Sequence, residues 1–265
     1  MAKLSQRISE RYEKVRPRIN TVIRNSAANR SFETFHSNKL ELKGPDLGRT
    51  QKILQGITVD HADLRVYQAS QAIRSDKHLL DVLGIYQAQL LVERIALGLT
   101  TETPFTEADL RELNRFCIQE KNFAGEYRIS DRVNIGEFHD ENDPLWFSRD
   151  LPRPVEVKWT DIPIHMSELC KFISKKHICP PLAAAVAHAW FTHVHPFHDG
   201  NGRVARLLAN LVLIRNDWPP IVIRHTERED YLDALEASES ITGFILTFGN
   251  AEKPELAPPS NERLI

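Results

Sequence analysis

Residues 195 to 202 read HPFHDGNG, and RVAR follows directly. This stretch is too polar for a hydrophobic core, and its residue types constrain the backbone more than an ordinary surface loop requires. Glycines allow successive backbone N–H groups to point outward together, and the N-terminus of a following helix adds positive potential. The stretch is therefore typical of an anion-binding site.

Two arginines extend this site. Arg203 and Arg206 are three positions apart, so they share one face of the helix that follows the glycines. They lie beside the backbone N–H groups of Gly200, Asn201 and Gly202. An anion hole flanked by two guanidinium groups suits a polyphosphate.

An aspartate and a histidine complete a candidate reaction centre. Asp199 has the wrong charge to bind phosphate, but a single carboxylate commonly holds the Mg²⁺ that phosphates bring. The protonated form of His195 is disfavoured near a helix N-terminus, which leaves a neutral imidazole able to accept a proton. A neutral base beside a metal-bound polyphosphate predicts group transfer to a hydroxyl.

Other interpretations of the same residues remain open. Gly-Asn-Gly alone is often a simple turn. Four histidines, at positions 188, 193, 195 and 198, could ligate zinc, although HExxH is absent and arginines at a helix start repel a cation. His188 and His193 otherwise read as partly buried helix residues. The Walker-type GxxxxGK[ST] loop is absent, which excludes a P-loop.

The loop must connect two buried helices. Pro180 opens the first helix, and Pro196 disfavours helical backbone at His195, so this helix should end just before the loop. The second helix should not start before the glycines and should end at NDWPP (216–220). The periodicity predicts further helices at about 5–24, 79–99, 106–117 and 161–177. The composition of about 123–158 predicts extended structure or a hairpin.

The composition narrows the class of protein. A chain of 265 residues with a net charge of −2 gives no sign of a nucleic-acid or membrane-surface binder. No apolar run approaches the roughly 20 residues of a membrane span, and no secretory signal opens the chain. Three cysteines without a CxxC pair indicate free thiols in a reducing cytoplasm.

HPFHDGNGRVAR (195–206) resembles the signature of the Fic family, HxFx(D/E)GNGRxxR, at every specified position. AGEYR (124–128) and VNIG (133–136) resemble the segment before the family's flap, and YLDAL (231–235) resembles the helix after its motif. The likeness covers roughly residues 80 to 250. It implies an all-α Fic fold, a helical bundle with a small β-hairpin flap over the active site, and transfer of AMP from ATP to a protein hydroxyl.

The resemblance also implies a role for each matching position. His195 would be the general base, Asp199 would hold Mg²⁺, and Phe197 would anchor the loop. The remaining matches would bind ATP: the α- and β-phosphates at Gly200, Asn201 and Gly202, and the β- and γ-phosphates at Arg203 and Arg206. His198 stands at a variable position and has no assigned role.

TFHSNKLELKG (34–44) resembles the family's N-terminal inhibitory motif, (S/T)xxxE(G/N). Ser37 and Glu41 match, whereas Leu42 stands where glycine or asparagine is expected. If this helix packs on the site, Glu41 should pair with Arg206 and keep that arginine from the γ-phosphate. A solvated helix glutamate is the alternative.

These observations predict an N-terminal helical region (1–75) with the inhibitory motif, a catalytic domain (76–250) and a loose tail (251–265). We expect a cytoplasmic protein adenylyltransferase that uses ATP and Mg²⁺, modifies a Ser, Thr or Tyr hydroxyl and is autoinhibited by Glu41. A protein substrate should dock along about 133–157 by strand pairing. The sequence leaves open whether the chain forms a homo-oligomer, and neither a membrane nor nucleic acid is an expected partner. The alternatives are AMP removal with Glu41 positioning a water, a non-catalytic nucleotide sensor, and another nucleotide or phosphoryl donor.

Overall fold

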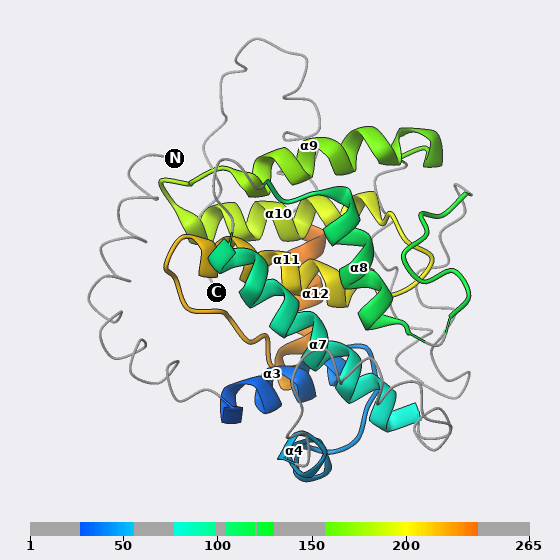
Figure 1. Cartoon of the computed structure of the whole chain (residues 1–265), viewed down its shortest axis with the longest axis vertical. Helices are drawn as coiled ribbons and strands as arrows, with labels where there is room; N and C mark the ends of the chain where they lie inside the picture. The colour runs from blue at the N-terminus through cyan, green and yellow to red at the C-terminus, as the bar shows by residue number, and fades with distance from the viewer. Residues whose placement is uncertain (1–26, 56–76, 99–103, 120, 130–156, 238–265) are drawn as a thin grey trace.

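The computed structural model of the chain (Figure 1) describes residues 27–55, 77–98, 104–119, 121–129 and 157–237. Within these ranges the fold is helical and has no strand, which confirms the all-α expectation. The helices are α3 (Ala27–Leu40), α4 (Leu47–Gln55), α7 (Lys77–Gly98), α8 (Glu107–Cys117), α9 (Ile162–Ser174), α10 (Pro180–Val194), α11 (Asn201–Arg215) and α12 (Arg228–Ala237). Two short 3₁₀ turns, η1 (Trp159–Asp161) and η2 (His225–Glu227), precede α9 and α12.

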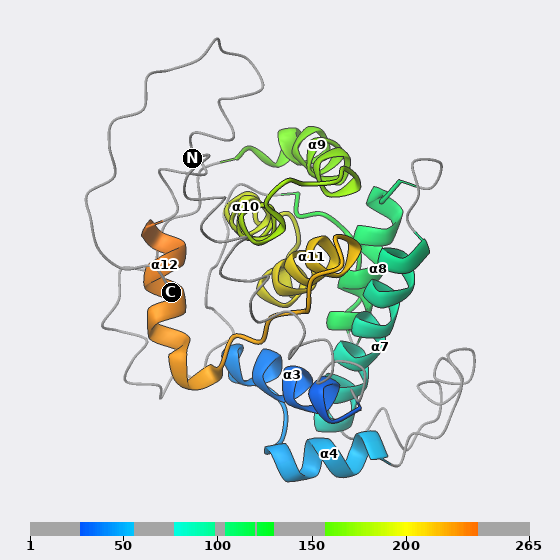
Figure 2. The ribbon, with the colours of Figure 1, turned by 90° about the vertical axis from the view of Figure 1, so that its left-hand side faces the viewer.

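Helix α11 is the centre of the molecule. It packs most extensively on α10, and it also contacts α7, α8, α9 and α3, so it is enclosed on several sides (Figure 2). Its apolar residues Val204, Leu208, Leu211 and Val212 are each 0% exposed. All residues of α11 except Gly202 and Ile214 are buried, so it is a core helix. The loop before α11 therefore stands on a rigid support.

The ends of the two central helices follow the sequence prediction. Pro180 occupies the first turn of α10, and α10 ends at Val194, so that His195 takes a left-handed conformation with φ 48°. Helix α11 begins at Asn201, with Gly200 as its N-cap at φ 81°. The loop is thus residues 195–200, and Gly202 lies inside the first turn of α11 rather than before it.

The flanking helices agree with the prediction except at one end. Thr106 and Asp109 form a reciprocal capping box at the start of α8. Helix α9 ends at Ser174, three residues before the expected His177. Two carbonyls of its last turn have side-chain partners instead. The ring of the nearby His177 contacts the Phe172 carbonyl at 3.0 Å, and Arg215 of α11 donates to the Ile173 carbonyl at 2.7 Å.

Helix α3 lies along α7 and α11 (Figures 1 and 2). Arg30 makes a two-pronged contact with Glu93 of α7, at 3.0 and 2.7 Å. Thr34 donates to Gln89 of the same helix at 3.2 Å. The segment that resembles the inhibitory motif is therefore attached to α7 by polar contacts.

Several sequence expectations fall outside the described residues: the helix at 5–24, the tail at 251–265, the boundaries near 75 and 250, and most of the extended segment at 123–158. The three cysteines all lie in described positions, where they are buried and form no disulfide. None of the described helices combines the length and apolar character needed to cross a membrane.

Candidate active site

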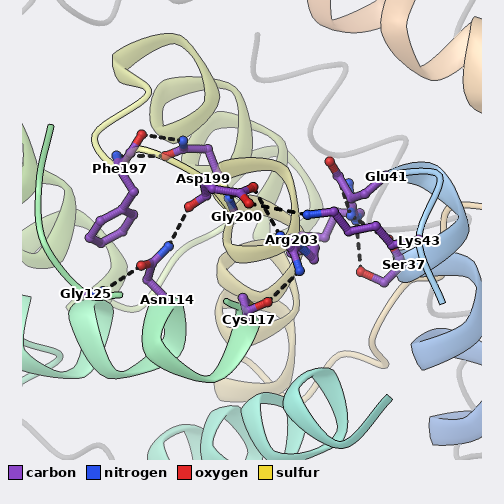
Figure 3. Close-up of polar contacts among 12 residues, drawn as sticks. Ser37, Glu41, Lys43, Asn114, Cys117, Gly125, Phe197, Asp199, Gly200 and Arg203 are labelled. Carbon is purple, nitrogen blue, oxygen red and sulfur yellow. Dashed lines mark hydrogen bonds and ion pairs between the residues drawn. The ribbon is translucent and has the colours of Figure 1, made fainter. Parts of the chain in front are cut away.

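The loop between α10 and α11 is held by its own residues. The buried Asn201 side chain accepts a hydrogen bond from the Phe197 N–H at 3.0 Å and donates to the Phe197 carbonyl at 2.8 Å (Figure 3). The Phe197 ring is 1% exposed and packs near the rings of Phe191 and Tyr127. These contacts support the anchoring role of Phe197. They also occupy both polar atoms of the Asn201 side chain.

Gly200 is required for two reasons. Its positive φ is unfavourable for residues with a side chain, and a Cβ there would lie 2.9 Å from Cγ2 of Ile118 in the segment after α8. The Asn114 amide of α8 donates to the Asp199 carbonyl at 2.8 Å and accepts from the Gly125 N–H at 2.8 Å. Helix α8 therefore positions the backbone of the loop just before α11 begins.

Asn114 was not identified from the sequence, although a signal is present. The apolar stripe of α8 runs through Leu110, Leu113 and Cys117, and Asn114 lies on that same buried face. A buried amide in an apolar stripe must have hydrogen-bond partners, which indicates a structural contact with another segment.

The Asp199 carboxylate contacts two cationic side chains. Its Oδ1 accepts from the Gly200 N–H at 2.5 Å and from Arg203 at 3.2 Å, and its Oδ2 contacts the Lys43 ammonium at 3.3 Å. Burial opposes ionisation of this carboxyl, but the charges of Arg203 and Lys43 outweigh it, so the pKa of Asp199 lies below its usual value.

The surroundings of Asp199 fit Mg²⁺. A cationic side chain from another part of the chain already lies against its carboxylate, and Mg²⁺ is commonly held by one carboxylate together with phosphates. In the described part of the chain, no three His, Cys, Asp or Glu side chains converge as a protein-only metal site requires. The zinc alternative therefore has no ligand set among these residues.

Arg203 is directed to protein groups in this structure. Its side chain is almost fully buried, and it donates to the Cys117 carbonyl and to Asp199 (Figure 3). Its Nε is buried without a hydrogen-bond partner. Arg203 thus links α8 to the metal-binding candidate Asp199, and its contact with phosphate stays a prediction.

Arg206 contacts both matching residues of the inhibitory motif. Its guanidinium donates to the Glu41 carboxylate at 2.8 Å, to the Ser37 carbonyl at 2.9 Å and to the Ser37 hydroxyl at 3.2 Å. Burial alone would raise the pKa of Glu41, but the charges of Arg206 and Arg203 together have the larger effect and lower it below its usual value. The carboxyl is therefore ionised. The other side of Arg206 faces the Tyr231 hydroxyl at 3.5 Å.

The Glu41 carboxylate also covers the start of α11. A Cβ on Gly202 would lie 2.5 Å from Glu41 Oε1, so this oxygen lies against the first turn of the helix. The first N–H groups of a helix lack intrahelical partners and attract anions. Glu41 is therefore an internal anion at the predicted phosphate position.

The turn after α3 places two charges at this site. The Lys43 N–H donates to the Asn38 carbonyl at 2.9 Å and the Leu42 N–H to the Lys39 carbonyl at 3.0 Å, a Schellman pattern. Leu42 takes the left-handed residue of this pattern at φ 55°. The conformation explains why glycine or asparagine is expected there, and the contact between Glu41 and Arg206 forms despite the leucine.

His195 has the properties of a neutral base, for reasons other than the predicted one. The sequence argument relied on the helix N-terminus, whereas in the structure burial is the main cause and the charge of Arg128 the next. Together they lower the pKa of His195 to about 4. His188 and His193 are buried as expected, with the His188 ring 3.0 Å from the Tyr231 hydroxyl, and His198 is exposed.

Comparisons with known proteins agree with this site. Residues 104–213 match the model of the Fic/DOC family. Two curated relatives are named protein adenylyltransferase Fic. The one from Aedes aegypti is 38% identical over 81 residues, covering 29% of this chain and 16% of the relative. The one from Drosophila erecta is 28% identical over 206 residues, covering 76% of this chain and 36% of the relative.

The chain thus spans well under half the length of these relatives. A crystal structure of a Fic domain containing signaling protein from Bacteroides thetaiotaomicron has a similar fold. It has a TM-score of 0.63 at 23% identity and covers 89% of this chain and 82% of its own. The family match runs from α8 through the loop and most of α11, so the elements that build the site are similar to those of the Fic/DOC family.

Proposed function

We propose that this chain is a protein adenylyltransferase that moves AMP from ATP to a Ser, Thr or Tyr hydroxyl, and that the end of α3 holds it in an inhibited state. The observation that carries the proposal is the position of a neutral His195 and an ionised Asp199 at the two ends of one loop, before an anion-binding helix start. The names of the relatives support the same class of reaction.

The chemistry follows from the residues of the loop. The free N–H groups at the start of α11 would hold the phosphates of ATP, and His195 would accept the proton of the target hydroxyl. The hydroxyl oxygen bonds to the α-phosphorus as the bond to the bridging oxygen of the β-phosphate breaks, so pyrophosphate leaves. Asp199 would hold Mg²⁺, which would neutralise charge on the phosphates.

Inhibition follows from the turn after α3. Glu41 takes the guanidinium of Arg206 and lies over Gly202, so it competes with phosphate for both. Lys43 lies on the carboxylate that would hold the metal. Loss of one such charge-assisted pair is worth about 1.5–3 kcal/mol, or about 10- to 150-fold in the population of the active state.

We expect the protein substrate to dock along residues 133–157, most of which lie outside the described residues. Support comes from the described residues at its base. Tyr127 pairs with Phe197 in an isolated antiparallel bridge, and the Arg128 N–H donates to the Pro196 carbonyl at 2.9 Å. Extended backbone before this segment thus lies directly beside the loop that begins with His195.

Transfer of a radioactive α-phosphate from ATP to lysate proteins, and to the chain itself, tests the proposal. Glu41→Gly should raise labelling at least about tenfold, because Arg206 is released. Adding His195→Ala to Glu41→Gly should lower labelling by about 10²–10⁴-fold while ATP binding is retained. Labelling within a few-fold of the single variant would overturn the role of His195.

The direction of the reaction is tested with an AMP-modified protein. If wild-type chain releases AMP from it and Glu41→Gly does not, Glu41 positions a water, and the reverse reaction replaces the proposed one. If neither variant labels protein or releases AMP, while both bind ATP, the chain is a nucleotide sensor.

A further inference from the structure

Arg128 is a buried arginine to which the sequence alone assigns no role. It is 5% exposed and lies between Tyr127 and the end of the described segment at residue 129. Its guanidinium donates to three backbone carbonyls: to His195 at 2.9 Å, to Val157 at 2.6 Å and to Val194 at 3.3 Å.

Two of these carbonyls belong to the end of α10. The last carbonyls of a helix have no intrahelical partner, and a positive charge beside them is favourable. The Arg128 backbone N–H adds a bond to the carbonyl of Pro196, the next residue of the loop. Arg128 therefore contacts three consecutive residues, 194 to 196, with His195 at their centre.

The conformation of His195 depends on such support. Its φ of 48° and ψ of 58° place it in the left-handed region, which costs a residue with a side chain free energy unless surrounding contacts maintain it. Because χ1 begins at this Cα, a change in the backbone of His195 changes the direction of its imidazole.

We propose that Arg128 is the positioning residue of the catalytic base: its guanidinium fixes the left-handed turn at His195 and so sets the direction of the imidazole. The role of His195 as base rests on the proposed function, whereas the contact between Arg128 and the turn does not. The same guanidinium also donates to the carbonyl of Val157, the residue that follows the segment 130–156. Arg128 therefore links Val157 to this turn.

The charge of Arg128 provides a second readout. After burial it is the largest cause of the lowered pKa of His195, which is about 4. Removing the charge should raise this pKa toward the ordinary value. Replacing arginine by lysine keeps the charge, but a single ammonium group cannot reproduce the contacts that the planar guanidinium makes with several carbonyls. The two substitutions separate charge from geometry.

The test compares Arg128→Met and Arg128→Lys in the full-length Glu41→Gly chain. Arg111→Met is the matched control, because it removes a guanidinium that contacts the same segment. The Arg111 guanidinium stacks 3.9 Å over the ring of Tyr127, the neighbour of Arg128, and donates to the Gly125 carbonyl at 3.0 Å. The measurements are the pKa of His195 by NMR, with His195→Ala to assign its signals, and kcat and KM for ATP.

We expect Arg128→Met to raise the pKa of His195 by more than about one unit. Both Arg128 variants should lower kcat by about ten- to a hundred-fold, with KM for ATP little changed because the phosphates bind at α11. Arg111→Met should change neither quantity. An unchanged pKa and kcat in Arg128→Met, or equal changes in Arg111→Met, would overturn the inference.

Two further outcomes are separated in advance. If Arg128→Met gives no cooperative thermal transition, Arg128→Lys decides: an unchanged kcat contradicts the inference, and a reduced kcat at unchanged KM supports it. If no variant transfers AMP, the proposed function fails, and the NMR titration of His195 still tests its contact with Arg128.

Discussion

At the scale of single residues, Leu42 is strained where the inhibitory turn is formed. Its φ is 55°, and the residue is 51% exposed, so the leucine gains little from burial. A left-handed conformation costs a residue with a Cβ about 1–2 kcal/mol, and glycine avoids this cost. We predict that Leu42→Gly stabilises the docked turn by about 1 kcal/mol and lowers basal self-labelling about fivefold.

Asp217 offers the control for this prediction. It has φ 61° in the corresponding turn after α11, where the Trp218 N–H donates to the Leu213 carbonyl at 2.9 Å. Asp217→Gly should raise the thermal midpoint without lowering self-labelling, because its turn does not contact Glu41. If Leu42→Gly raises the midpoint and leaves self-labelling unchanged, the strain at Leu42 does not limit docking.

Lys43 carries the second residue-scale prediction. Its ammonium lies 3.3 Å from Asp199, with 23% and 14% of the two side chains exposed. A cation bound there would compete with the proposed Mg²⁺, so Lys43→Ala should lower the Mg²⁺ concentration for half-maximal activity by about two- to fivefold. Mn²⁺ binding followed by electron paramagnetic resonance, in the presence of ATP, should tighten by a similar factor.

Lys52→Ala, on the exposed side of α4, removes the same charge away from the site and should leave both values unchanged. Equal Mg²⁺ requirements in wild type and Lys43→Ala would show that the ammonium does not compete with the metal.

The sequence predicted those site residues that are close together along the chain. Residues 195–206 form one loop and one helix turn, so their types and spacing define their geometry directly. Asn114, Arg128 and Lys43 contact the loop from 85, 67 and 156 positions away. No local pattern brings such residues together; only the packing of α8, the segment 121–129 and α3 does so.

At the scale of elements, α3 was recognised by resemblance and not by periodicity. Its buried face is polar: Ser31, Thr34, Ser37 and Asn38 are each at most 8% exposed. Apolar periodicity is the main signal for a helix in a sequence, and this helix is bound to α7 and α11 by hydrogen bonds instead. Helices α10 and α11, which have apolar faces and Pro or Gly at their ends, were predicted to within a few residues.

The polar face of α3 leads to a prediction about pH. The Glu33 carboxyl accepts from Asn210 at 2.7 Å, and burial raises its pKa from 4.5 to about 7, with a smaller contribution from Glu93 that Arg30 opposes. Between pH 4.5 and about 7, Glu33 is therefore protonated when α3 is docked and ionised when α3 is free. Docking is strongest below this window and weakens as pH rises through it.

We expect the self-labelling rate of wild type, divided by that of Glu33→Gln at the same pH, to increase several-fold between about pH 5 and pH 7.5. The ratio removes pH effects that the two proteins share. Glu168→Gln, which changes an exposed carboxyl on α9, should give a flat ratio. A flat ratio with Glu33→Gln would mean that its protonation is not linked to docking.

At the scale of the whole molecule, the site lies where two parts of different character meet. Helices α10 and α11 lie in the apolar core, whereas α3 and the turn after it are attached by ion pairs and hydrogen bonds. Segments with few buried apolar contacts open at lower free energy than a core. We therefore expect α3 to be the element that leaves the site while the site itself stays folded.

In the proposed mechanism Glu41 and the phosphates of ATP compete for one place, so we expect docking of α3 and binding of ATP with Mg²⁺ to be coupled, and such coupling is reciprocal. Glu41→Gly should tighten ATP binding by about 10- to 150-fold in calorimetry. In the wild type, saturating ATP with Mg²⁺ should then speed hydrogen exchange of the α3 amides by a comparable factor. The exchange rate of the fully undocked helix sets the upper limit of this increase. Amides of α10 serve as the internal reference and should not change. Tighter binding in Glu41→Gly without faster α3 exchange in the wild type would mean that nucleotide enters beside the docked helix, and that Glu41 acts on the pose of ATP and not on the position of α3.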